Sequence, residues 1–218
     1  MSLPQPRSSR LDAIAQARQR IMRDGEALPT PWVAPEVQRS WQRCLAHGLQ
    51  PEQPVVFEAV SKAQLTHTLE ANHALIDAAR PVLEHLGRAR YFALLANADG
   101  VVIAASGAID HGDRHAHLIS RIGTDLSERS IGTTAIGMAL TEQHSVWLHR
   151  GEHFFDHNKV YSCAGAPLFG PDGQCVGMLD VTGIDAVERP ELKHLVTQTA
   201  SRIENALVLD QPHRLLLR

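Results

Sequence analysis

Cysteine side chains are the first candidates for chemistry in this chain, because a thiolate is both a nucleophile and a metal ligand. Cys163 and Cys175 each begin an apolar segment, and Cys44 lies far upstream. Catalysis would require a base or a cationic group that lowers the pKa of one thiol. Closely spaced further cysteines that could resolve an oxidised thiol are not evident, so inert, buried thiols are the favoured interpretation. Three cysteines without the spacing of a metal knuckle also indicate reduced thiols rather than a structural disulfide.

Histidines form the second candidate group. Of the 13 histidines, His149, His153 and His157 are spaced by four residues, as on one face of a helix that could bind zinc or iron. Gly151 and Asn158 favour a loop over a helix in this segment. Hydrogen-bonded or solvated histidines are therefore the default interpretation, and we expect neither a metal site nor a cofactor.

Asp180 is a carboxylate within an apolar strand, an arrangement that costs free energy unless the group is paired or hydrogen-bonded. In an alternating strand it shares a face with Met178, whereas Leu179 and Val181 face the other way. The more apolar face should be covered by helices, so Asp180 should point toward a cavity on the opposite face. The alternative is a carboxylate that the local backbone or the Thr182 hydroxyl satisfies.

Aromatic residues gather between residues 147 and 161, where Trp147, Phe154, Phe155 and Tyr161 occur. Ligand cavities are mostly apolar with a few placed polar groups, so these four side chains are candidate pocket walls. Ordinary packing in the core is the alternative for each of them.

Thr133 and Thr134 follow Gly132 at the start of a short predicted helix. The free backbone N–H groups at such a start can hold an anion or the carbonyl group of a ligand. A capping threonine explains the same residues without any ligand, and both interpretations stay open.

The elements that position these residues indicate a mixed α/β fold. Apolar runs without a helical period predict two hairpins, which force antiparallel pairing. We expect a sheet of five or six strands, with two long amphipathic helices on one face and the irregular segments 108–142 and 149–161 across the other. A pocket can form under such loops. The expected elements are helix 61–87, strands 91–97 and 101–105, helix 131–140, strands 145–148, 162–169 and 175–182, and helix 188–209.

Composition limits the function classes. With 44% hydrophobic and 21% charged residues the chain is typical of a globular protein. A formal net charge of -3 provides no attraction for phosphate backbones, which disfavours direct DNA binding. No apolar run is long enough for a membrane span and no signal-peptide pattern begins the chain, so we expect a cytoplasmic protein without membrane association.

Several segments resemble the GAF sensor region of acetoin-regulator-like activators of sigma-54-dependent transcription. They are ANADGVVIAA at 96–105, IGTTAIG at 131–137, EHF at 152–154, SCAGAP at 162–167 and GMLD at 177–180, with RSWQRC at 39–44 similar to the N-terminal segment of the same group. The resemblance covers about residues 35–210 in order. It implies a GAF-like fold with a loop-roofed pocket, and it adds His153 and Cys163 to the candidate ligand-binding residues.

The resemblance also implies a function, namely sensing of a small organic effector as the input domain of a bacterial transcription activator. Such a domain regulates an ATPase module and a DNA-binding module further along the chain, and only these modules would meet sigma-54 RNA polymerase and DNA. The chain lacks a GxxxxGK[ST] phosphate loop, and we do not expect an enzyme. Two alternatives stay open: an enzyme similar to GAF-fold methionine-sulfoxide reductases using Cys163, and an interaction module that senses a partner protein.

The chain departs from the family pattern at two positions. Leu126 stands where the family usually has a tryptophan, and Thr134 stands where it usually has an asparagine. Both positions are expected to face the pocket, so the effector of a relative is not carried over. An outer stripe of Leu69, His73 and Ile76 further leads us to expect a homodimer.

The expected organisation has four parts. Residues 1–9 are disordered or a remnant of cloning, and residues 10–57 form an N-terminal helical appendage. Residues 58–210 form the GAF-like sensor domain, and residues 211–218 begin a linker to downstream modules.

Overall fold

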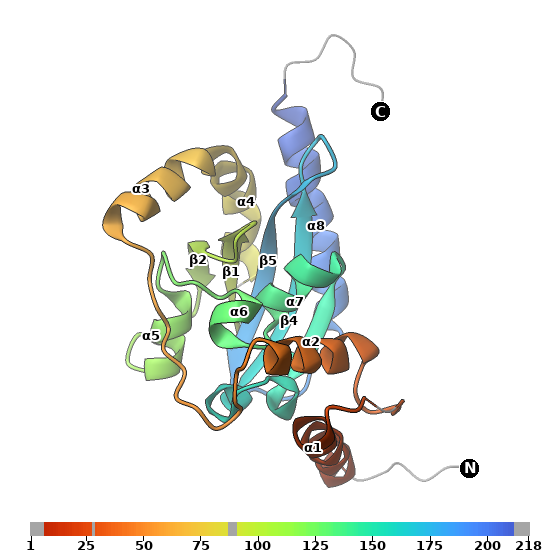
Figure 1. Cartoon of the computed structure of the whole chain (residues 1–218). Coiled ribbons are helices and arrows are strands. Elements are labelled where there is room, and N and C mark those ends of the chain that lie inside the picture. Colours follow the sequence, from red (N-terminus) through yellow and green to blue (C-terminus); the bar gives the residue numbers. More distant parts are fainter. Residues whose placement is uncertain (1–6, 28, 87–90, 212–218) are drawn as a thin grey trace, which may run out of the picture.

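The computed structural model describes residues 7–27, 29–86 and 91–211, which form a mixed α/β fold around an antiparallel sheet (Figure 1). The order across the sheet is β2-β1-β5-β4-β3, and every pairing is antiparallel. The expected antiparallel sheet is confirmed, with five strands in the described part of the chain. They are β1 (Tyr91–Asn97), β2 (Val102–Gly107), β3 (Val146–His149), β4 (Tyr161–Phe169) and β5 (Cys175–Ile184).

The two hairpins form at the turns that the sequence predicts. Between β1 and β2, the Asn97 side-chain oxygen accepts hydrogen bonds from the backbone N–H groups of Asp99 and Val101, at 3.1 and 2.9 Å. Gly100 takes a φ of 85° there, a conformation that favours glycine. The turn at 171–173 joins β4 to β5. These turns set the pairing of β1 with β2 and of β4 with β5, and β1 pairs with β5 to join the two hairpins at the centre of the sheet.

Two helices, α4 (His73–Leu86) and α8 (Leu192–Leu209), cover one face of the sheet. α8 begins at Leu192 rather than at residue 188. The apolar side chains between these helices and the sheet are here called the helix-side core. They include Leu75, Ala79, Leu83, Val196 and Ile203 from the helices, and Ala93, Leu95, Leu179 and Val181 from the strands.

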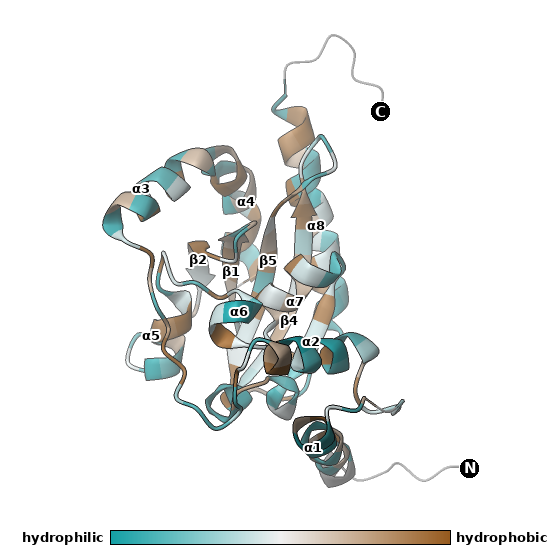
Figure 2. Cartoon of the chain, viewed as in Figure 1, coloured by the Kyte–Doolittle hydropathy of each residue, from teal (hydrophilic) through white to brown (hydrophobic). Residues whose placement is uncertain are grey.

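The expected helix 61–87 is two helices in the described residues, and its end at residue 87 lies outside them. α3 (Lys62–Ala71) ends at Asn72, whose side-chain N–H donates to the Thr68 carbonyl oxygen at 2.8 Å. The backbone N–H of Asn72 donates to the same oxygen at 3.1 Å, and after Asn72 the chain continues as α4 in another direction (Figure 1). Thr68 is the buried residue of α3, which is mostly hydrophilic (Figure 2). Between these two helices, it is therefore α4 that covers the sheet.

Short helices and loops cover the opposite face of the sheet and are here called the roof. Segments 108–142 and 149–161 supply them, as the sequence predicts. Their apolar side chains meet those of β1, β4 and β5 in a second cluster, the roof-side core. The elements of the roof are α5 (Arg114–Ser120), α6 (Glu128–Ile131), α7 (Ala135–Glu142), η1 (Arg150–Glu152) and η2 (Asp156–Val160).

The N-terminal helices α1 (Arg7–Asp24) and α2 (Pro35–Ala46) pack on the roof rather than standing apart from it (Figure 1). Pro35 lies in the first turn of α2, where a backbone N–H needs no helical partner. Trp41 is fully buried, and its Nε1–H donates to the Glu152 carbonyl oxygen at 2.8 Å. Trp41 thus belongs to the roof-side core, which the N-terminal helices complete.

The chain ends are described only in part. α1 begins at Arg7, within the segment 1–9 that is expected to be disordered, and residues 1–6 lie outside the described residues. Residues 212–218 of the expected linker lie outside them too. Across the described ranges, none of the helices has the length and apolar character needed to cross a membrane.

Exposed apolar side chains lie on α8, where Leu195, Val208 and Leu209 are 39%, 45% and 51% exposed. The stripe expected from the sequence is placed differently, since Leu69 and Ile76 are half-buried against the helix-side core. We predict a homodimer that buries the exposed side chains of α8. Sedimentation at micromolar concentration should show a dimer for the wild type and a monomer for Val208→Lys. A wild type that sediments only as a monomer would contradict the prediction.

Candidate functional site

A small cavity lies between the sheet and the roof and is here called the roof cavity. The centre of a water molecule can move through only about 10 Å³ of it, enough for about one water. A larger occupant therefore requires the roof to move outward. The cavity is lined by Phe57, Ile119, Leu126, Ile131, Thr134, Ala135, Ile136, His153, Asn158, Tyr161, Cys163, Asp180 and Thr182.

Asp180 lies at the floor of the roof cavity, in the middle of β5. It is paired in register with Leu94 of β1 and Gly165 of β4, and it is 1% exposed. The Thr182 hydroxyl donates to Oδ2, while Oδ1 has no hydrogen-bond partner among the described residues. Burial raises the pKa of this carboxyl to about 7. The local hydroxyl thus satisfies one oxygen, and the other stays available to an occupant.

Cys163 and His153 meet beside Asp180. Cys163 Sγ lies 3.5 Å from His153 Nε2 and 3.2 Å from Thr182 Oγ1. His153 Nδ1 lies 3.0 Å from the Arg150 carbonyl oxygen, an acceptor, so Nδ1 carries the ring proton and Nε2 faces the thiol as an acceptor. Burial lowers the pKa of His153 to about 4 and, with the Asp180 charge, raises the pKa of Cys163 well above its usual value. The pair is therefore uncharged at neutral pH and lacks the thiolate that nucleophilic catalysis needs.

The three regularly spaced histidines do not share a site. His149 lies on the helix-covered face, where its Nδ1 is 2.7 Å from Ser162 Oγ, and His157 is exposed. His153 alone of the three lines the roof cavity. In the described part of the chain, no group of three or more histidine, cysteine or acidic side chains is placed to hold a metal ion.

Trp147 is not brought to the roof cavity. In the short strand β3, Val146 and Leu148 face the roof-side core, so Trp147 faces the helix side, where it stacks on His149 with ring centroids 6.2 Å apart. The alternation of β3 therefore removes Trp147 from the candidate pocket walls.

The other aromatic candidates all lie on the roof side. Tyr161 lines the cavity, and its hydroxyl donates to the His115 carbonyl oxygen at 3.2 Å. Phe154 and Phe155 are buried behind the lining and pack against Gly132, where a Cβ atom would come within 2.9 Å of Phe154 Cβ. They support the roof instead of facing the cavity.

The two threonines have different partners. Thr134 lines the cavity and caps α7, since its Oγ1 accepts from the Gly137 N–H at 3.1 Å and donates to the Leu126 carbonyl oxygen at 3.3 Å. Thr133 points toward α2, where its hydroxyl lies 2.7 Å from Ser40 Oγ. The capping interpretation thus accounts for Thr134, and Thr133 connects the roof to the N-terminal helices.

Asn158 is the polar lining residue that sequence reasoning missed. It is 1% exposed, its Nδ2–H donates to the Ile131 carbonyl oxygen at 3.4 Å, and its Oδ1 has no partner among the described residues. An asparagine in a loop is normally solvated, so the sequence gives no signal for its burial. Leu126, where the family pattern has a tryptophan, does line the cavity.

A partly buried ion-pair network joins α2 to the roof. Ser40 Oγ donates to Glu128 Oε2 at 2.6 Å, and Arg43 Nε and Nη2 donate to the same carboxylate at 2.6 and 2.9 Å. Arg43 Nη1 also donates to Glu142 at 2.7 Å. These carboxylates raise the pKa of Arg43, while Arg39 and Arg43 lower that of Glu142. Ser40 of this network also contacts the hydroxyl of Thr133, the residue next to Thr134 in the cavity wall. The network therefore connects α2 to the cavity wall.

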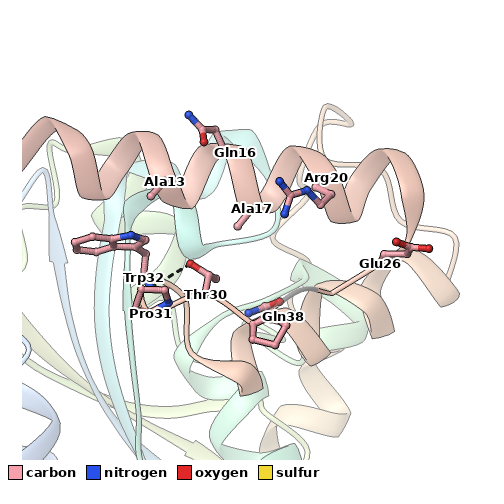
Figure 3. A pocket seen from close by; sticks show the side chains of 10 residues that line it. Ala13, Gln16, Ala17, Arg20, Glu26, Thr30, Pro31, Trp32 and Gln38 are labelled. Atoms are coloured by element: carbon pink, nitrogen blue, oxygen red, sulfur yellow. Dashed lines mark hydrogen bonds between the residues drawn. The ribbon is translucent and has the colours of Figure 1, made fainter.

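A second hollow, open to solvent, lies between α1 and the segment 26–38 and has a volume of about 310 Å³ (Figure 3). Trp32 lies near Ala13 at one end, and Arg20, Glu26 and Gln38 lie toward the other. None of the expected site residues lines it. The roof cavity is the stronger candidate because it contains buried polar atoms without partners.

The environment of Cys163 leads to one prediction. Replacing Cys163 by serine should change the free energy of unfolding by only about 1 to 2 kcal/mol, because a hydroxyl replaces a small buried thiol among hydrogen-bonding neighbours. Denaturant unfolding measures this change. Methionine-sulfoxide turnover by the wild type that Cys163→Ser abolishes would contradict the inert thiol and favour an enzyme.

Comparison with known proteins places this geometry in a family. The model of the GAF domain family matches residues 63–207. The signal-transduction and transcriptional-control protein of Clostridium beijerinckii is 28% identical over 84% of this chain and 29% of its own length. The acetoin catabolism regulatory protein of Cupriavidus necator is 30% identical over 82% of this chain and 28% of its own length.

The acetoin dehydrogenase operon transcriptional activator of Bacillus subtilis is 27% identical over 88% of this chain and 32% of its own length. This chain thus spans about 30% of the length of these curated relatives. Among solved structures, the Escherichia coli DhaR(N)–DhaL complex has a TM-score of 0.75 at 18% identity, covering 81% of this chain and 61% of that chain. This likeness shows the same fold.

Proposed function

The chain belongs to the GAF domain family, and from this premise we propose that it is the sensory input domain of a bacterial transcription activator. In the proposal, a small organic effector enters the roof cavity and shifts the roof toward a second conformation. The names of the curated relatives, which describe transcriptional regulators and activators, support the regulatory part of the proposal. A longer chain with an ATPase module and a DNA-binding module would carry the response.

One observation supports the effector site above all others, namely Asp180 Oδ1, a buried carboxylate oxygen in the cavity lining that has no partner among the described residues. Leaving such an atom unsatisfied costs about 1 to 3 kcal/mol or more. Native proteins pair nearly all their buried polar groups, so an exception in a cavity is a candidate ligand contact. An effector that donates a hydrogen bond to Oδ1 would remove this cost.

The signal has a route out of the cavity through α2. An occupant larger than a water must displace lining residues such as Ile131 and Thr134. Their neighbour Thr133 contacts Ser40, and Glu128 holds Arg43. The proposal is that effector binding shifts the population between two arrangements of the roof and α2, because the effector has different affinities for them.

A partner protein is the second candidate input. The E. coli protein of known structure was crystallised as a complex with DhaL, which supports an interaction module of the same fold. The uncharged state of Cys163 and His153 argues against the sulfoxide-reductase alternative.

Thermal unfolding with small metabolites tests the proposed function. An effector present at about 100 times its dissociation constant should stabilise the domain by about 2.7 kcal/mol. Asp180→Ala should lose most of this stabilisation while the unliganded domain stays folded, and Asp172→Ala in the exposed β4–β5 turn should keep it. A full ligand-induced shift in Asp180→Ala would contradict the assignment of the site.

A further inference from the structure

The polar atoms of the roof cavity define the chemistry of its occupant. Resting on the proposed function, we infer that the effector is a small, non-anionic molecule with two hydrogen-bond donors, of which a diol is the simplest kind. One donor binds Asp180 Oδ1 and the other binds Asn158 Oδ1.

The two acceptors come from opposite sides of the cavity. Asp180 belongs to β5 in the floor, and Asn158 belongs to η2 in the roof. Each residue is 1% exposed, so water from outside does not satisfy it. Thr182 holds the other oxygen of Asp180, and the bond from Asn158 Nδ2–H to the Ile131 carbonyl oxygen leaves Oδ1 as the unpaired atom of that amide. Both free atoms are therefore acceptors when the Asp180 carboxyl is ionised.

The remaining polar groups of the lining already use their protons. The Tyr161 hydroxyl donates to the His115 carbonyl oxygen, and the Thr134 hydroxyl donates to the Leu126 carbonyl oxygen. The one proton of the Thr182 hydroxyl goes to Asp180. An occupant that brings only acceptors, such as a ketone, would break one of these bonds to gain a partner.

Cys163 and His153 are the remaining polar side chains of the cavity lining. The Cys163 thiol and His153 Nε2 face each other at 3.5 Å, and His153 Nδ1–H is bound to the Arg150 carbonyl oxygen. The lining residues include no lysine or arginine. A carboxylate ligand would thus face Asp180 without a compensating cation, which excludes anions from the effector class.

Three compounds with the same three-carbon skeleton separate the possibilities. Propylene glycol has two donors, hydroxyacetone has one donor and a carbonyl group, and lactate is an anion. We expect the dissociation constant of propylene glycol to be at least about tenfold lower than that of hydroxyacetone, because one hydrogen bond to a buried acceptor is lost. Lactate should not bind. Calorimetry and melting temperature at pH 7.5 measure these constants.

Two variants test the assignment of the acceptors. In Asp180→Asn, Thr182 still donates to the side-chain oxygen, so the free atom becomes an N–H donor. A hydroxyl oxygen and a carbonyl oxygen can both accept from it, so the preference for propylene glycol over hydroxyacetone should disappear. Asn158→Leu should weaken propylene glycol about tenfold and leave hydroxyacetone nearly unchanged. Asp172→Asn, in the exposed turn, is the matched control and should keep the wild-type ranking.

The outcomes distinguish this inference from the proposed function. The inference is overturned if the wild type binds hydroxyacetone or lactate as tightly as propylene glycol, or more tightly. It is also overturned if Asp180→Asn keeps the wild-type preference for propylene glycol over hydroxyacetone. Failure of all three compounds to bind also overturns it. The proposed function survives each of these results if another small molecule stabilises the wild type and not Asp180→Ala, and it fails if no small molecule does so.

Discussion

Replacing Trp41 by alanine will lower the free energy of unfolding by about 4 kcal/mol, as expected when a fully buried tryptophan is truncated. The indole fills the space between α2 and the roof, and its Nε1–H bond to the Glu152 carbonyl oxygen is lost with it. The change should also loosen the roof, since Ser40 and Arg43 of the same helix hold Glu128. Denaturant unfolding measures the loss of stability, and hydrogen exchange of residues 131–136 reports the loosening.

Trp147→Ala is the matched control. Trp147 is half-buried on the helix side, so its truncation should cost less than that of Trp41 and leave exchange in residues 131–136 unchanged. If Trp41→Ala costs less than about 1 kcal/mol, or if exchange at 131–136 stays as in the wild type, α2 is not a structural part of the roof.

Asp180→Asn will make the domain more stable than the wild type at neutral pH, and the difference will vanish in acid. Burial raises the folded-state pKa of Asp180 to about 7 from 3.8, so the folded state binds the proton more tightly. The stabilisation from the protonated carboxyl is fully present below pH 3.8 and is lost as the pH rises through about 7. The difference between the two pKa values corresponds to about 4 kcal/mol.

The measurement is the free energy of unfolding of both proteins from pH 4 to pH 8. The absolute curves also contain His153, whose lowered pKa of about 4 costs stability as the pH falls, and Glu152, whose pKa is raised to about 7. Both groups remain in the variant, so subtracting the two curves isolates Asp180. A difference that is independent of pH would show that this carboxyl is not held in a costly buried state.

Turn residues and the alternation of apolar residues along the strands predicted the hairpins of the sheet, because both features depend on neighbours in the sequence. The turn at Asn97–Gly100 and the alternation of the ten-residue strand β5 were sufficient to place the hairpins and to assign Asp180 a face. In β3, with four residues, alternation alone does not say which face is the roof, and the side of Trp147 was therefore missed. The long predicted helix is divided at Asn72, where the chain changes direction between α3 and α4, and hydrophobic periodicity does not detect such a break.

The site depends more on contacts between distant residues. The apolar face of α2 is visible in the sequence as Val37, Trp41 and Cys44, but nothing local states that it packs on the roof. The same holds for Asn158, whose unpaired oxygen results from the fold of the segment around it. Burial without a partner is a tertiary property, and it appears only when all neighbours are known.

The central claim is that a small effector binds under the roof, and methyl NMR tests it most directly. The isoleucine methyl groups of Ile119, Ile131 and Ile136 line the roof cavity, whereas those of Ile103 and Ile203 lie in the helix-side core. With the compound that most raises the melting temperature, the first three should shift strongly and the last two should stay nearly unchanged. Shifts confined to the helix side, or none at Ile119, Ile131 and Ile136 on saturation, would contradict the account.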